Sequence, residues 1–184
     1  GGLSGILGPV SQLIQTDPSY ALAMEVALGA AAQHIVVEDA SAAKAAIRFL
    51  QKQKAGRATF LPLSTVRGKP SALSRKEWEA CPGFLGFAGE LCRIPQAYRE
   101  VLDSLLGKVA VMEELDTASA AAKRFQYRFR IVTLDGQVIH AGGAFTGGSA
   151  SRQAGSLSRR GEIARMKETL RQLERELEKA DAPL

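Results

Sequence analysis

Hydrophobic and polar positions recur in one order along the chain, and this order predicts a first set of helices and strands. A helix over residues 17–29 has aspartate and proline at its start and glycine at its end, the residue types that favour N-caps, first turns and C-terminal stops. A short β-branched run at 34–38 predicts a buried strand. An alanine-rich helix then begins at an aspartate cap and ends at glycine, over residues 39–56, and residues 57–63 predict a second strand.

The same order returns later in the chain. Tyr20 and Tyr98 lie 78 positions apart, and each stands nine positions before a glycine. The run Ala-Ser-Ala-Ala of residues 40–43 recurs at 118–121, at the same offset. Two further strands are predicted at 109–113 and 129–134. A long period that occurs once indicates a pair of related α/β lobes and not a solenoid, so we expect an α/β fold of the α+β type.

These signals divide the chain into four parts. We expect lobe one over residues 5–67, a connector over 68–94 and lobe two over 95–150. The remaining part, 151–184, is a basic junction followed by a helix. The connector is rich in glycine, proline and serine, with one short helical piece at 74–80 in which Trp78 is expected to pack as an anchor. Lobe two should close with a hairpin around an Asp-Gly turn that joins 129–134 to a last strand at 137–142.

Four glycines near the end of lobe two surround an apolar residue and a hydroxyl. They are Gly142, Gly143, Gly147 and Gly148, with Phe145 and Thr146 between them. The lysine of a phosphate-binding loop is missing, and the spacing differs from a dinucleotide-binding fingerprint, so a small nucleotide- or anion-binding domain is the weaker alternative. Paired glycines allow a second backbone to approach, which favours an edge strand that pairs with another chain. A hinge loop without a partner is the competing interpretation.

The tail of the chain carries a heptad pattern. Its apolar residues are spaced alternately by three and four positions: Ile163, Met166, Leu170, Leu173, Leu177 and Ala180. This spacing predicts a coiled-coil helix, which needs a partner helix. The simplest explanation is that the chain is a fragment whose preceding helix has been removed. The alternative is a helix that folds back onto its own domain, which would make the protein a monomeric DNA-binding module.

Positive charge is unevenly distributed, although the net charge is only +5. No acidic residue lies between Asp39 and Glu77, while nine cations do: Lys44, Arg48, Lys52, Lys54, Arg57, Arg67, Lys69, Arg75 and Lys76. Such a window favours phosphate backbones, and Lys52, Lys54 and Arg57 are the candidate DNA contacts within it. A solvated helix face with a basic loop explains the same charges without a ligand. A second basic cluster, Arg152, Arg159 and Arg160, precedes the heptads.

Composition excludes several classes of protein. With 46% hydrophobic and 23% charged residues the chain is typical of a globular protein, and no run of about 18 uncharged apolar residues is present to span a membrane. Cys81 and Cys92 fit no zinc or redox spacing, and His34 and His140 stand apart from other ligand types. We therefore expect no catalytic residues, no metal and no cofactor.

Two segments carry a family resemblance. The run that begins at residue 8, GPVSQLIQTDPSYALAMEVALGAAAQHIVVEDASAAKAAIRFLQKQKAGRATFLPL, resembles the first half of an SMC (structural maintenance of chromosomes) hinge domain. FRIVTLDGQVIHAGGAFTGGS, followed by basic residues and heptads, resembles its second half. The resemblance covers roughly residues 5–180 and is of a bacterial type. It implies two pseudo-repeated lobes with mixed sheets, and a homodimer in which lobe one of each copy pairs edge strands with lobe two of the other.

The resemblance also assigns roles to residues. The four glycines match the family's interface glycines, and Arg152, Arg159 and Arg160 match basic residues associated with DNA contact. Phe145 departs from the more usual aliphatic residue, and the pair His140-Ala141 replaces a more usual turn pair. The full-length protein would be an ATPase that binds ATP in head domains not present here, recruits kleisin-type subunits, and works at the nucleoid in the cytoplasm during chromosome condensation and segregation. The hinge itself is expected to have no enzymatic activity.

Overall fold

The computed structural model describes residues 3–68, 74–149, 170–171 and 173–175 of the chain. The first repeat runs from β1 to β4: β1 (Ile6–Pro9), α1 (Val10–Leu13), β2 (Gln15–Thr16), α2 (Ala21–Leu28), β3 (Ile35–Val37), α3 (Ala40–Gln53) and β4 (Phe60–Pro62). After α4 (Arg75–Glu79), the second repeat runs from β5 to β8: β5 (Phe84–Phe87), α5 (Ala88–Leu91), β6 (Cys92–Arg93), α6 (Arg99–Leu106), β7 (Val109–Met112), α7 (Leu115–Arg124) and β8 (Arg130–Thr133). The hairpin strands β9 (Val138–Ile139) and β10 (Phe145–Thr146) follow. Short 3-10 turns at Pro18–Tyr20, Gly29–Gln33 and Gln96–Tyr98 flank α2 and α6.

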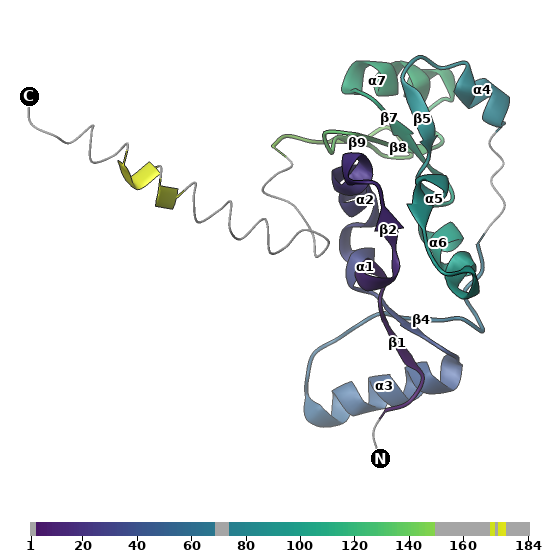
Figure 1. Ribbon diagram of the computed structural model, residues 1–184, viewed down its shortest axis with the longest axis vertical. Coiled ribbons are helices and arrows are strands. Elements are labelled where there is room, and N and C mark those ends of the chain that lie inside the picture. The colour runs from purple at the N-terminus through teal and green to yellow at the C-terminus, as the bar shows by residue number, and fades with distance from the viewer. Residues whose placement is uncertain (1–2, 69–73, 150–169, 172, 176–184) are drawn as a thin grey trace, which may run out of the picture.

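The strands form three sheets, and the α/β class with mixed sheets is confirmed. One sheet has the order β1-β3-β4, a second β10-β9-β8-β7-β5, and a third consists of β2 and β6. The pairs β3–β4 and β7–β8 are parallel, whereas β1–β3, β5–β7 and β8–β9 are antiparallel. Figure 1 shows an elongated molecule with α3 at one end, α7 at the other and α1, α2, α5 and α6 between them.

The repeat extends further upstream than the sequence pattern indicated. Residues 6–13, ILGPVSQL, and residues 84–91, FLGFAGEL, both form a strand followed by a one-turn helix. Gly8 and Gly86 occupy the same bulged position in the two strands, with φ of 130° and 151°, where a side chain would be strained. The second repeat therefore begins at Phe84, within the residues expected to form a connector. Four-residue strands that contain glycine and proline give too weak a pattern to identify alone.

Most predicted helix boundaries agree with the structure. The Asp17 carboxylate accepts a hydrogen bond from the Ser19 amide at 3.1 Å, and the Asp39 carboxylate accepts one from the Ala42 amide at 2.8 Å. The bond from the Ser19 amide lowers the pKa of Asp17. The end of α3 was predicted wrongly: the helix ends at Gln53 and is capped by Lys54, which takes the left-handed conformation with φ of 50°, and not by Gly56. The Lys54 and Ala55 amides close the last turn by bonding carbonyls of that turn.

Two hydrophobic clusters hold the fold together. The central cluster lies between the repeats, where α2 and α6 bury Met24, Leu102 and Leu106 against strand residues. The second lies under α7 and is built around Trp78, which is fully buried and stacks on Phe125 with ring centroids 4.3 Å apart. Trp78 is thus a packing anchor, as predicted. The predicted hairpin of β8 and β9 is also present.

Candidate functional site

The C-terminal hairpin places an exposed strand at the edge of the five-stranded sheet. β10 pairs with β9 on one side and is the terminal strand of that sheet among the described residues. Its Phe145 side chain is 53% exposed, the largest exposed fraction among the large apolar residues of the two repeats and the hairpin. The predicted glycine-flanked edge strand is therefore confirmed as an edge, and it presents an aromatic ring to solvent.

The first glycine pair forms the turn of this hairpin. Gly142 and Gly143 have φ of 98° and 100°, a region that side chains rarely adopt. The Gly142 amide donates to the Tyr127 carbonyl at 2.7 Å, and the Gly143 amide donates to the His140 carbonyl at 3.0 Å. The His140 amide donates to Ala144 O at 2.8 Å and closes the loop. Both glycines are thus needed by the backbone of this chain itself.

The second glycine pair contacts a glutamine side chain. The Gly148 amide donates to Gln137 Oε1 at 2.8 Å, and Gln137 Nε2 donates back to the Gly148 carbonyl at 3.1 Å. A Cβ added to Gly147 would overlap the same amide oxygen, so the position accepts only glycine without rearrangement. We call this two-point contact between Gln137 and Gly148 the amide clamp. No sequence signal identified Gln137, because the contact joins residues on either side of the hairpin.

The interface role predicted for the four glycines therefore stays a prediction. Each glycine has a sufficient reason within its own chain, either a positive φ or the Gln137 side chain. Phe145 and Thr146 have no comparable constraint on the backbone, although the Thr146 hydroxyl lies 2.9 Å from His140 Nε2. Phe145 is consequently the better residue with which to test pairing.

The amides of Gly142, Gly143 and Gly148 already donate within the chain, so they are not free to bind a phosphate. Two cavities of the described surface lie elsewhere, one lined by Ile14, Gln15, Thr16, Ala21 and Arg93, the other by Arg67, Asp103, Ser104, Leu105, Lys108 and Val109. Among the described residues no group of three or more His, Cys, Asp or Glu side chains is arranged to hold a metal ion. The nucleotide-binding alternative gains no support from the geometry of the glycines.

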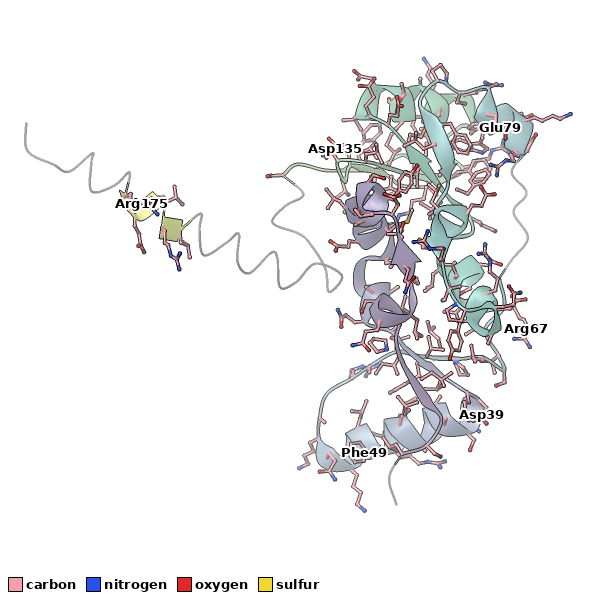
Figure 2. All side chains as sticks on the ribbon, viewed as in Figure 1. Asp39, Phe49, Arg67, Glu79, Asp135 and Arg175 are labelled. Atoms are coloured by element: carbon pink, nitrogen blue, oxygen red, sulfur yellow. The ribbon has the colours of Figure 1, made fainter. Side chains whose placement is uncertain are left out.

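A basic surface covers α3 and the loop that follows it. Lys44, Arg48 and Lys52 are exposed and spaced four residues apart, so they share one side of the helix. Lys54 and Arg57 continue the exposed run beyond the helix. Figure 2 shows Phe49, which is 46% exposed, in the C-terminal half of α3. We call Lys44, Arg48, Lys52, Lys54 and Arg57 the α3 basic face.

Two other cations of the acid-free window, Arg67 and Arg75, make contacts within the fold. Arg75 forms ion pairs with Glu79 and Glu90, and Arg99 forms one with Asp103. Arg67 donates to the carbonyls of Leu63, Ser64 and Val66. Arg67 and Arg75 are thus used by the fold, whereas the α3 basic face and the exposed Lys76 face solvent without such contacts in the described structure.

Several predicted site residues lie outside the described residues. They are Arg152, Arg159, Arg160, Ile163, Met166, Leu177 and Ala180. Leu170 and Leu173 are described, and both are helical, with exposed fractions of 58% and 48%. Two exposed leucines three positions apart on a helix agree with the predicted heptad pattern, while the coiled coil itself remains a prediction.

The cysteines are buried and unpaired. Cys81 and Cys92 are free thiols with exposed fractions of 6% and 4%. Burial raises the pKa of Cys92 to about 11, so the nucleophilic thiolate is scarce at neutral pH. Both thiols are thus free, and their burial makes them part of the packing.

Comparison with known proteins identifies the family. The family model described as "SMC proteins Flexible Hinge Domain" matches residues 3–122. The chain belongs to the SMC hinge family. The hinge is 44% identical over 158 residues to the chromosome partition protein Smc of Bacillus subtilis (strain 168), a match that covers 84% of the hinge chain and 13% of that protein. The chain thus spans only a small part of the curated relatives it matches.

Solved structures agree with this assignment. The asymmetric dimer of the Geobacillus stearothermophilus SMC hinge domain is 42% identical with a TM-score of 0.77, and the match covers 96% of the hinge chain and 71% of that chain. The Pyrococcus furiosus Smc hinge domain with an extended coiled coil is 32% identical with a TM-score of 0.67, with 95% and 66% covered. The hinge is therefore distinct from the ATPase head and is not a catalytic domain, as expected. No helix among the described residues is long and apolar enough to cross a membrane.

Proposed function

We propose that this hinge joins two copies of a chromosome partition SMC protein as a homodimer, connects their coiled-coil arms, and binds DNA without sequence preference. The observation that carries the proposal is an asymmetry between the two repeats. In the second repeat β8 is followed by β9 and β10 in the same sheet, whereas the first repeat ends its sheet at the equivalent strand, β4. Within the described residues, the first repeat thus has no counterpart of the strands that complete the second.

The open side of β4 is suited to receive a strand. The Thr59 carbonyl and the Leu63 amide bond to β3, so the backbone groups of Phe60, which lies between them, point away from β3. Edge strands with unpaired backbone groups are templates for pairing with a second chain. The exposed edge of β10 on the other copy is the strand that would pair with β4. Two such contacts related by twofold symmetry close the dimer.

The helices above the two sheets show the same asymmetry. Counted from their caps, Ile47 of α3 corresponds to Ala122 of α7, an offset of 75 residues that replaces the offset of 78 suggested by the two Ala-Ser-Ala-Ala runs. Ala122 is 2% exposed beneath a complete sheet, while Ile47 is 45% exposed beside the short one. A second copy that adds its edge strand beside β4 would cover Ile47, which gives the dimer an apolar contribution in addition to backbone hydrogen bonds.

The relatives support the same partner and arms. The Geobacillus stearothermophilus hinge was solved as a dimer, and the Pyrococcus furiosus hinge with an extended coiled coil. In this chain the heptad residues at the C-terminal end would begin one arm. The complete protein would bind ATP in its heads, recruit kleisin-type subunits and act at the nucleoid in the cytoplasm.

DNA binding is assigned to two basic surfaces. Like charges four residues apart on a helix repel one another, so the stripe Lys44, Arg48 and Lys52 is unfavourable without an anion. Phosphates relieve this repulsion and release counterions, a mode of binding that is independent of sequence and sensitive to salt. Arg152, Arg159 and Arg160, which precede the heptads in the sequence, are the second set of proposed DNA contacts.

The mass of the chain in solution tests the core of this proposal. We expect light scattering to give twice 19.6 kDa over a wide concentration range. A variant that lacks residues 161–184 should remain dimeric, because the proposed interface lies in the repeats and not in the tail helix. A monomer at every concentration would reject the homodimer, and a dimer lost on deletion of the tail would assign it to helix pairing.

A further inference from the structure

The strand offered to the second copy is too short to hold its own position. β10 has two residues, Phe145 and Thr146, and pairs with β9 at only two register positions. Strands of this length are marginal without additional contacts. Beyond β10 the amide clamp pairs the side chain of Gln137 with both backbone groups of Gly148. The clamp therefore replaces the backbone hydrogen bonds that a longer β9–β10 ladder would make beyond Thr146.

Gln137 is itself held in place. The backbone amide of Gln137 donates to the Thr133 hydroxyl at 3.0 Å, and Thr133 is 1% exposed. That hydroxyl donates to an Asp135 carboxylate oxygen. Gln137 Nε2 lies 3.3 Å from the other carboxylate oxygen of Asp135, in addition to its bond to Gly148. The side chain thus has one supported orientation, and Figure 2 shows Asp135 on the connection between β8 and β9.

We infer that Gln137 is a positioning residue for dimerisation: it holds β10 and Gly148 in the conformation that the second copy binds. The inference rests on the proposed dimer. A two-residue strand that moved freely would have to be ordered at each association, and that entropy cost would weaken the complex. A clamp that orders the strand beforehand removes this cost. The same contact fixes Gly148, the point from which the chain leaves the hairpin.

The clamp depends on the Nε2 donor of Gln137 as well as on the shape of its side chain. Gln137→Ala removes both bonds. Gln137→Glu keeps the size and can still accept from the Gly148 amide, but a carboxylate cannot donate to the Gly148 carbonyl and would face Asp135. If Gln137 only filled space, the glutamate variant would behave like the original chain. If it is a clamp, the glutamate variant fails as the alanine variant does.

The experiment measures two quantities on the same samples. Backbone amide exchange at Gly148, followed by NMR, reports the clamp, and the dissociation constant from sedimentation equilibrium reports the dimer. For Gln137→Ala we expect faster exchange at Gly148 and a dissociation constant raised roughly tenfold, the effect of about two net hydrogen bonds. Gln137→Glu should show both changes. Gln96→Ala, at an exposed glutamine in the 3-10 turn before α6, is the matched control and should show neither.

The outcomes separate the clamp from the dimer. An original chain that is monomeric rejects the proposed dimer, while exchange at Gly148 still reports whether the clamp forms. Faster exchange with an unchanged dissociation constant overturns the positioning role. Unchanged exchange in Gln137→Ala overturns the clamp itself. Faster amide exchange throughout the core of a variant, and not only at Gly148, would attribute its weaker dimer to general unfolding, so the expected core exchange is that of the original chain.

Discussion

Arg130 of β8 reaches across the molecule to the end of α2, where its Nη1 donates to the Ala27 carbonyl at 2.6 Å. Its Nη2 donates to the Val26 carbonyl at 3.3 Å. Arg130 and Ala27 are separated by 103 positions in the chain, so one side chain of the second repeat caps a helix of the first. Burial lowers the pKa of Arg130, a sign that desolvation accompanies this cap. A guanidinium at a helix C-terminus is also favoured by the helix dipole.

Loss of this cap should destabilise the fold. We expect Arg130→Ala to lower the free energy of unfolding by about 1–3 kcal/mol, because two carbonyls lose a charged donor. Arg130→Lys should restore part of the loss, since an ammonium can reach one carbonyl but not both. Urea denaturation measures the effect, and Arg57→Ala, at an exposed arginine, should change the midpoint little. Equal midpoints for Arg130→Ala and Arg57→Ala would contradict the cap.

The anchor of the second cluster should be more costly to remove. Trp78 is fully buried and lies within 6.0 Å, centroid to centroid, of Phe84, Phe87, Phe125 and Phe129. Trp78→Ala is expected to cost about 3–5 kcal/mol through lost burial and the cavity left behind. Trp78→Phe should cost much less. Calorimetry or denaturant unfolding measures both, and similar losses for the two variants would mean that aromatic packing is not what Trp78 provides.

The edge strand can be tested without disturbing the glycines. Phe145→Glu places a charge on the exposed face of β10, and we expect it to raise the dimer dissociation constant at least tenfold while the monomer stays folded. Leu115→Glu is the matched control, because Leu115 is also apolar and 41% exposed but lies at the start of α7. Sedimentation equilibrium decides the matter. If the two variants associate alike, β10 is not the contact strand.

Charge reversal separates the two basic surfaces. Replacement of Arg152, Arg159 and Arg160 by glutamate should abolish DNA binding in fluorescence anisotropy and leave the dimer intact. Unchanged binding would instead place the site on the α3 basic face. For the original chain, log affinity should fall steeply with log salt, by about 0.9 for each phosphate neutralised, and a flat dependence would reject the electrostatic mechanism.

The α3 basic face has its own matched pair of variants. Lys52→Glu with Lys54→Glu should weaken binding and reduce the salt slope by about two. Lys108→Glu with Lys123→Glu reverses the same number of charges at exposed lysines of the second repeat, and should weaken binding less. An equal loss in both pairs would indicate that net charge alone, and not a defined surface, governs binding.

The buried thiol makes stability depend on alkaline pH. Burial raises the pKa of Cys92 from 9.0 to about 11, so the folded state keeps a proton that the unfolded state releases. This contribution is fully present below pH 9 and is lost as the pH rises toward about 11. We expect the urea midpoint to fall across this range, and to fall less in Cys92→Ala. A parallel fall in both proteins would assign the alkaline loss to other groups.

Local sequence signals determined much of the fold because their physical causes are local. Asp17 and Asp39 cap helices of the first repeat through bonds to amides two and three positions away. The heptad pattern and the acid-free window of cations could likewise be read from the sequence, since charge and periodicity do not depend on distant contacts. The strands β1 and β5 were missed because each spans four residues interrupted by glycine, and only their pairing with β3 and β7 makes them strands.

The sequence by itself therefore determined the family, the α/β class, most helices and the place of the glycine-rich edge strand. Only the tertiary structure decided which groups serve the chain and which are free for a partner. It assigned Gly147 to Gln137 and Arg130 to the end of α2, and it left Phe145 and the α3 basic face exposed. The physical reason is that capping and periodicity act within a few residues, whereas the occupancy of an edge, a carbonyl or a charge depends on which distant segment folds against it.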